Sequence, residues 1–149
     1  MLIRDAVPSD EPLWQELWAG YLRFYETELS DAVTARTWER LIRREDGLFC
    51  RIAEISGEVC GFSHSVLHAG TWVTAPICYL EDLYVAPERR GHGIGEALIR
   101  DLVELAGTKG WSRLYWHTRR SNAAARSVYD RFTQADDFVR YRLSFEDTA

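Results

Sequence analysis

The chain has 149 residues, enough for one domain that buries a sizeable core without disulfide staples. Its formal net charge of −5 argues against nucleic acid as the main partner, because proteins that bind a phosphate backbone usually carry basic patches. No apolar run approaches about 18 residues, so nothing in the sequence supports membrane insertion or secretion. We therefore expect a single cytoplasmic domain over residues 1–149, with neither nucleic acid nor membrane as a partner.

The number and spacing of the cysteines are also consistent with a cytoplasmic protein. Cys50, Cys60 and Cys78 are odd in number and lie in segments that have the pattern of strands. They form no CxxC pair, and no clustered histidines accompany them, so we predict no metal site. We interpret them as small buried hydrophobic side chains in a reducing environment.

The first third of the chain predicts a strand over residues 2–7 and then a helix, which Ser9 or Asp10 is placed to cap. Apolar and aromatic residues of that helix recur at helical spacing. They are Trp14, Leu17, Trp18, Tyr21, Leu22 and Tyr25. A second helix is predicted over residues 34–44.

The period then changes to that of strands. Residues 48–55 and 59–68 flank Ser56-Gly57-Glu58 and predict a β-hairpin, and residues 77–85 predict a third, mostly apolar strand. Downstream we predict a helix that ends at Gly107 or Gly110, a strand at 111–118, a helix at 122–132 and an alternating strand at 138–145. This order indicates an α+β fold with a mixed sheet.

The segment ERRGHGIGEALI, residues 88–99, places three glycines in five positions between a predicted strand and a predicted helix. The first backbone N–H groups of a helix have no partner inside it, and the helix dipole adds partial positive charge there. A strand, a glycine turn and a helix N-terminus therefore predict an anion site, for which phosphate is the natural ligand.

Two common phosphate loops fit poorly. A P-loop needs GxxxxGK[ST], but Gly95 is followed by Glu96 and Ala97, so the lysine and the magnesium-binding hydroxyl are missing. A Rossmann fingerprint needs GxGxxG in a βαβ unit, whereas Gly91, Gly93 and Gly95 give GxGxG after a hairpin. A plain strand-to-helix turn that binds nothing is a further alternative.

A third kind of loop fits. Arg90, Gly93 and Gly95 stand at R-x-x-G-x-G spacing, which resembles the pyrophosphate loop of the GNAT family of acetyl-CoA-dependent N-acetyltransferases. YLEDLYVAPERRGHGIGEALI, LYWHT and NAAARSVYDRF are similar, in order, to that family's strand, loop, helix, strand and second helix. YLEDLYV further resembles the diamine and polyamine branch, and LWQELWAGYLRFYE resembles the histone and polyamine branch.

The resemblance implies the GNAT fold, a mixed, mostly antiparallel twisted sheet of about six to seven strands flanked by helices. It also implies how acetyl-CoA is held. The glycines let successive N–H groups wrap the pyrophosphate, Arg90 adds charge, and strand-like hydrogen bonds hold the pantetheine arm. The residues so assigned are Leu83, Tyr84, Val85, Arg90, Gly91, His92, Gly93, Ile94, Gly95, Asn122 and Ala125. His92 is expected to act through its backbone, and Arg89 to face solvent.

Amine acetylation needs a base, because an amine with a pKa near 10.4 is neutral in only about one molecule in 2,500 at pH 7. By resemblance, Glu81 is our candidate base, acting directly or through water; a solvated strand carboxylate is the alternative. Asp82 is expected on the opposite face of the strand. The Val85 N–H is the candidate donor to the oxyanion.

Asn122, Ala125 and Tyr129 are spaced i, i+3 and i+7 and so share one helical stripe. The resemblance makes Tyr129 the general acid, since a phenol stays protonated at neutral pH and has a basicity comparable to that of the leaving thiolate. The family usually carries a glycine four residues later, where this chain has Thr133. We therefore expect a rebuilt helix end, one turn longer.

These observations together predict an N-acetyltransferase that moves an acetyl group to a primary amine in a ternary complex. A small cationic amine, such as a polyamine or an amino acid, is the favoured acceptor, with Tyr21, Tyr25, Glu26 and Glu28 as candidate lining residues. A lysine side chain is one alternative acceptor, and a non-catalytic acyl-CoA-binding module is an alternative function. Family resemblance also predicts a homodimer.

Overall fold

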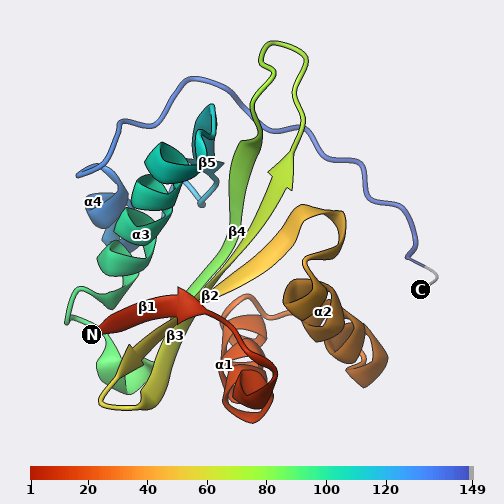
Figure 1. The fold of residues 1–149 in the computed structure, drawn as a ribbon. Helices are drawn as coiled ribbons and strands as arrows, with labels where there is room; N and C mark the ends of the chain where they lie inside the picture. The colour runs from red at the N-terminus through yellow and green to blue at the C-terminus, as the bar shows by residue number, and fades with distance from the viewer. Residues whose placement is uncertain (148–149) are drawn as a thin grey trace. The chain divides into compact units, whose positions relative to one another are not determined.

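The structure, a computed structural model, describes residues 1–147. Its contacts divide the chain into two compact units, Met1–His117 and a smaller C-terminal unit that begins at Thr118. Each unit is described below by itself. Figure 1 shows the path of the chain and the element labels used from here on.

The larger unit is built on a five-stranded sheet with the strand order β1-β2-β3-β4-β5. Neighbouring strands are antiparallel except for β4 and β5, which are parallel. The parallel pair requires a crossover, which the helix α3 supplies. The strands are β1 (Leu2–Asp5), β2 (Leu48–Ile55), β3 (Glu58–His68), β4 (Ile77–Val85) and β5 (Arg113–Trp116).

Helices cover both faces of this sheet (Figure 1). On one face α1 (Glu11–Phe24) and α2 (Asp31–Arg43) bury an aromatic core that includes Trp14, Trp18, Trp38 and Phe62. On the other face α3 (Ile94–Lys109) buries Ile94 and Leu98 against β2 and β3. The predicted apolar stripe of the first helix is therefore its packing face.

Several predicted elements are confirmed closely. The hairpin forms from β2 and β3, β4 spans the predicted residues 77–85, and α3 ends before Gly110, which adopts φ +73°. A left-handed residue after a helix favours glycine because it has no Cβ to clash. The three cysteines are buried and free, and burial raises the pKa of Cys78 to about 11.

The C-terminal unit differs from the prediction. Its helix α4 spans Ala123–Tyr129 and is shorter than the expected 122–132 rather than one turn longer. Thr133 does not adopt a left-handed conformation. Residues 138–145 form no strand, so the sheet has five strands in the described part of the chain, not six to seven. Their alternating pattern is strand-like, but they have no hydrogen-bonded neighbouring strand within residues 1–147.

The start of α1 also departs from the prediction. Asp10 ends the short 3-10 helix η1 (Pro8–Asp10) and precedes α1, but its carboxylate does not cap that helix. It accepts two hydrogen bonds from Arg4, at 2.8 and 2.9 Å, and a third from the Val7 N–H at 2.8 Å. This partly buried bidentate pair links β1 to the first helical turn.

We expect Asp10→Asn to lower the free energy of unfolding at pH 7 by about 2 to 3 kcal/mol, because Arg4 loses its paired charge. Arg4 holds the pKa of Asp10 below its usual value, so this stability is present above the unfolded-state pKa and is lost as pH falls through the folded-state pKa. In urea unfolding, the difference in free energy of unfolding between the wild-type protein and Asp10→Asn should therefore be smaller below about pH 4 than at pH 7. Glu45→Gln, which breaks the exposed pair with Arg36, is the control and should change little. If Asp10→Asn lost the same free energy of unfolding at all pH values, this result would contradict the account.

No helix within residues 1–147 is long and apolar enough to span a membrane.

Candidate active site

The glycine loop joins β4 to α3 through a short 3-10 helix, η3 (Pro87–Arg89). Gly93 lies at φ +77° as the N-cap residue of α3, and the first intrahelical bond runs from the Ala97 N–H to the Gly93 carbonyl at 3.0 Å. The earlier N–H groups of the helix have no partner inside it. A Cβ placed on Gly93 would meet no protein atom within 4 Å, so open space adjoins the exposed backbone. This is the geometry of an anion site.

The side chains of the loop turn back onto the protein. The Arg90 Nε donates to the Val85 carbonyl at 3.1 Å, and its guanidinium lies 5.3 Å from the centre of the Tyr84 ring. The His92 Nδ1 lies 3.2 and 3.0 Å from the carbonyl oxygens of Arg89 and Arg90. Arg90 therefore brings positive charge to the end of β4, and His92 braces the backbone of the loop. Arg89 pairs with Glu58 rather than simply facing solvent.

Within the larger unit, the edge of β4 beside β5 is unpaired where the loop begins. Pairing with β5 runs only from Ile77 to Leu80. The Ala86 N–H donates to the Cys60 carbonyl of β3 at 2.8 Å. Because successive residues of a strand direct their backbone groups to opposite edges, those of Leu83 and Val85 face away from β3, towards the open edge. A linear ligand can add to this edge as a strand does.

Tyr84 contributes differently from its two neighbours. Its side chain is buried in the aromatic core, with ring centres 6.1 Å from those of Phe62 and of Tyr21. Its backbone groups face β3, with which it pairs at Phe62. Tyr84 thus supports the strand from the core side.

β4 contains a β-bulge at its two adjacent carboxylates, Glu81 and Asp82. His64 pairs with Asp82 and Ser65 pairs with Leu80, so Glu81 is the extra residue without a partner on β3. A bulge breaks the strict alternation on which the expectation of opposite faces depended. Glu81 is exposed, yet nearby protein atoms raise its pKa through desolvation, and the Asp82 carboxylate raises it further.

Sequence reasoning gave His64 no role, but the structure places it in a buried polar chain. The Trp14 Nε1 donates to the His64 Nε2 at 2.9 Å, and the His64 Nδ1 lies 2.9 Å from Asp82 Oδ2. The Tyr21 hydroxyl donates to Asp82 Oδ1 at 2.6 Å. No local sequence pattern predicted this role, because it depends on the register between β3 and β4, which sets His64 opposite Asp82.

The predicted acid and two predicted cofactor contacts belong to the C-terminal unit. Asn122 is the N-cap of α4, and its side-chain oxygen accepts from the Ala125 N–H at 3.4 Å. Its amide nitrogen donates to the Thr118 hydroxyl at 3.2 Å. Tyr129 is the last residue of α4 and is partly buried. Ala125 and Tyr129 lie within α4, and Asn122 precedes the helix, so the shared stripe of the three residues stays a prediction.

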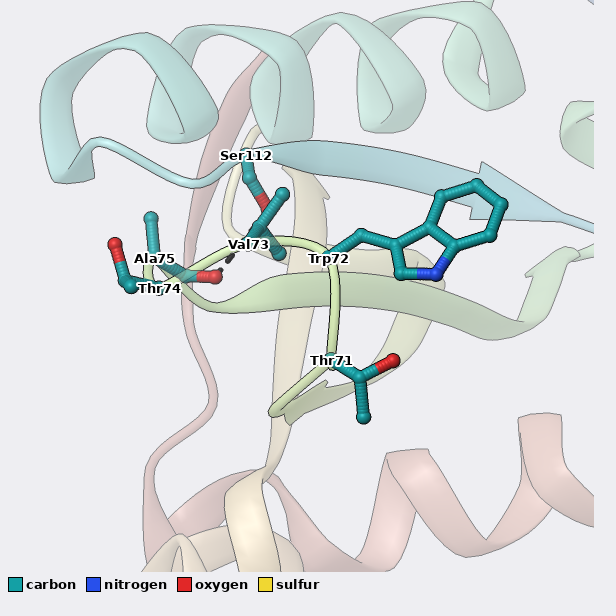
Figure 2. Close-up of a pocket in the computed structure, with 6 residues that line it drawn as sticks. All are labelled: Thr71, Trp72, Val73, Thr74, Ala75 and Ser112. Carbon is teal, nitrogen blue, oxygen red and sulfur yellow. Dashed lines mark hydrogen bonds between the residues drawn. The ribbon is translucent and has the colours of Figure 1, made fainter.

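Two surface hollows lie in the larger unit. One, of about 480 Å³, is lined by the loop between β3 and β4 together with Ser112, whose hydroxyl bonds to the Ala75 carbonyl at 3.3 Å (Figure 2). None of the predicted site residues lines it. The other, of about 440 Å³, includes Gly93 beside residues of β1 and α3, and so adjoins the glycine loop.

Comparison with known proteins gives a consistent picture. A model of the acetyltransferase (GNAT) family matches residues 11–133. The D-amino-acid N-acetyltransferase HPA3 of Saccharomyces cerevisiae is 29% identical over 144 residues, which cover 95% of this chain and 89% of the yeast protein. The uncharacterized N-acetyltransferase YhfO of Bacillus subtilis is 31% identical over 146 residues, 97% of each chain.

Solved structures share the fold. AAC(6')-Iy, in complex with the bisubstrate analogue CoA-S-monomethyl-acetylneamine, matches with a TM-score of 0.79 and 20% sequence identity, covering 97% of this chain and 98% of that one. The family match spans well over half of the residues and includes β4, the glycine loop and α4. The chain belongs to the GNAT family and is an N-acetyltransferase whose co-substrate is acetyl-CoA.

Proposed function

We propose that this enzyme transfers the acetyl group to a small cationic primary amine, such as a polyamine or an amino acid, by direct attack in a ternary complex. The observation that carries the acetyl-CoA part of the proposal is the edge of β4 at Leu83 and Val85, which is not paired with β5 and is joined through η3 to the glycine turn at the start of α3. The name of the yeast relative, a D-amino-acid N-acetyltransferase, supports an amino acid among the acceptors.

The proposed acetyl-CoA site is formed mainly by backbone groups of β4 and the glycine loop. The N–H groups of residues 90–95 surround the pyrophosphate, Arg90 supplies charge, and Leu83 and Val85 bond to the pantetheine arm. Asn122 and Ala125 are further proposed contacts of acetyl-CoA, and we propose residues 1–149 as a single N-acetyltransferase domain, which the family match over residues 11–133 supports. The Val85 N–H donates to the oxyanion.

The proposed chemistry uses two side chains. Glu81 takes the proton of the attacking amine, directly or through water. Tyr129 gives its hydroxyl proton to the departing thiolate. Proton transfers of this kind each accelerate a reaction by about 10² to 10⁴.

Glu81→Gln should lower kcat/KM for the amine by about a hundredfold and remove the acid limb of its pH profile. Desolvation and Asp82 raise the pKa of Glu81, so the limb of the wild-type enzyme should lie above the ordinary glutamate value of about 4.3. Glu88→Gln, an exposed carboxylate of the adjacent loop, is the control. An acid limb that survives in Glu81→Gln would assign the base to another group.

The acceptor is tested by following coenzyme A release with a panel of amines: spermidine, L- and D-amino acids, and a lysine-containing peptide. We expect kcat/KM to be highest for a small cationic amine. Preference for the peptide would identify a lysine side-chain acetyltransferase. Tight binding of acetyl-CoA without turnover on any amine would identify a binding module and overturn the proposal.

We also propose a cytoplasmic homodimer. The three free, buried thiols suit a reducing compartment. The apolar side chains that alternate along residues 138–145, such as Tyr141 and Leu143, are 65–92% exposed and offer a surface that a second copy can cover. Light scattering should give twice the 17.2 kDa chain mass, and a mass of one chain at micromolar concentration would contradict the dimer.

A further inference from the structure

The polar chain Trp14–His64–Asp82–Tyr21 runs from the buried core to a partly exposed phenol, entirely within the larger unit. Its buried end is firmly packed. Trp14 is fully buried, His64 is 3% exposed, and the imidazole stacks on Phe62 with ring centres 4.3 Å apart. Its outer end, Tyr21, stacks on Trp18 at 5.3 Å.

The hydrogen-bond donors and acceptors of this polar chain have only one consistent arrangement. An indole N–H can only donate, so the His64 Nε2 must accept from Trp14. The imidazole proton is then on Nδ1, which donates to Asp82 Oδ2. Protonation of Nε2 would set two donors against each other. The core therefore fixes His64 as the neutral Nδ1–H tautomer.

This assignment determines what Tyr21 offers. One oxygen of Asp82 accepts from His64, and the other accepts the Tyr21 proton in a short, charge-assisted bond of 2.6 Å. Burial and the Asp82 charge raise the pKa of Tyr21, so the phenol keeps its proton. With its one proton directed at Asp82, the Tyr21 oxygen presents only lone pairs to its other neighbours.

A hydrogen-bond acceptor backed by a carboxylate suits an N–H donor, above all one that carries positive charge. Glu81, the proposed base, is the residue next to Asp82 in β4, and its charge also acts on the Tyr21 hydroxyl. We infer that the Tyr21 hydroxyl oxygen accepts a hydrogen bond from the acceptor amine, and that Asp82, His64 and Trp14 are positioning residues that orient this hydroxyl. The inference rests on the proposed function and adds a specificity-determining contact to it.

Tyr21→Phe tests the contact. With the fastest acceptor of the amine panel, we expect the KM for the amine to rise about tenfold, while the KM for acetyl-CoA changes less than about twofold. Tyr115→Phe removes a comparable hydroxyl, which is held 2.9 Å from the His68 Nε2, and should leave the KM for the amine unchanged. An unchanged KM for the amine in Tyr21→Phe, or an equal rise in Tyr115→Phe, would overturn the inference.

A double-mutant cycle tests the positioning role. His64→Gln alone should raise the KM for the amine several-fold, but in the Tyr21→Phe background it should add almost nothing, because the hydroxyl that it orients is absent. Asp82→Asn, which preserves shape, provides a second cycle if His64→Gln folds poorly. Additive effects would contradict the positioning role. Wild-type turnover with an unaffected Tyr21→Phe variant defeats this inference alone, whereas a wild-type enzyme inactive on all amines defeats the proposed function as well.

Discussion

Replacement of Gly93 by valine is expected to weaken acetyl-CoA binding by about a hundredfold or more. Gly93 has φ +77°, a conformation that a β-branched residue adopts only with strain. The valine side chain would also enter the open space beside the first N–H groups of α3. Loss of two charge-assisted hydrogen bonds, worth about 1.5 to 3 kcal/mol each, is sufficient for this effect. Calorimetric titration with acetyl-CoA measures it.

Gly110→Val is a matched control for backbone strain. Gly110 caps the other end of the same helix at φ +73°, and it also has no protein atom within 4 Å of a built Cβ. Both variants should lose comparable stability, but only Gly93→Val should lose affinity. Equal affinity for acetyl-CoA in the two variants would show that the backbone at Gly93 does not contact the cofactor.

Tyr129→Phe is expected to lower kcat by about 10² to 10³ while the Kd for acetyl-CoA stays nearly constant. The phenol is the proposed donor of the proton that the leaving thiolate needs, and phenylalanine keeps the ring but removes that proton. Rapid-quench measurement of coenzyme A formation in the first turnover separates this chemical step from product release.

Ser127→Ala is the control for disturbance of α4. It removes another hydroxyl of the same helix, one that donates to the Ala124 carbonyl at 2.7 Å. Its kcat should remain close to that of the wild-type enzyme. A Tyr129→Phe variant with wild-type kcat would exclude Tyr129 as the acid and leave protonation of the thiolate to solvent or to another residue.

Local patterns were sufficient to predict the elements whose partners are close in sequence. The hairpin of β2 and β3 consists of two largely apolar segments on either side of a two-residue turn, and Gly110 marks the end of α3. The strand predicted at residues 138–145 was wrong for a related reason. Alternation shows that a segment suits a sheet, but a strand also needs a paired neighbour, and Val139 and Phe145 are instead exposed.

The candidate site likewise has features that the sequence could predict and features that it could not. The glycine loop was predictable because its φ requirements and helix N-terminus are local properties of residues 90–95. The bulge at Glu81, the early end of β5 at Trp116 and the pairing of His64 with Asp82 were not predictable, because each depends on the register between strands. The features that distinguish this site from a generic anion-binding loop therefore depend on the register between strands, which local sequence patterns do not determine.

The most direct test of the central claim is an NMR titration of the ¹⁵N-labelled protein with coenzyme A. If the backbone of residues 90–95 holds the pyrophosphate, the amide resonances of Gly91, Gly93 and Gly95 should shift strongly and saturate together with those of Leu83 and Val85. Binding that leaves the glycine amides unmoved, or no binding of coenzyme A at all, would contradict the account.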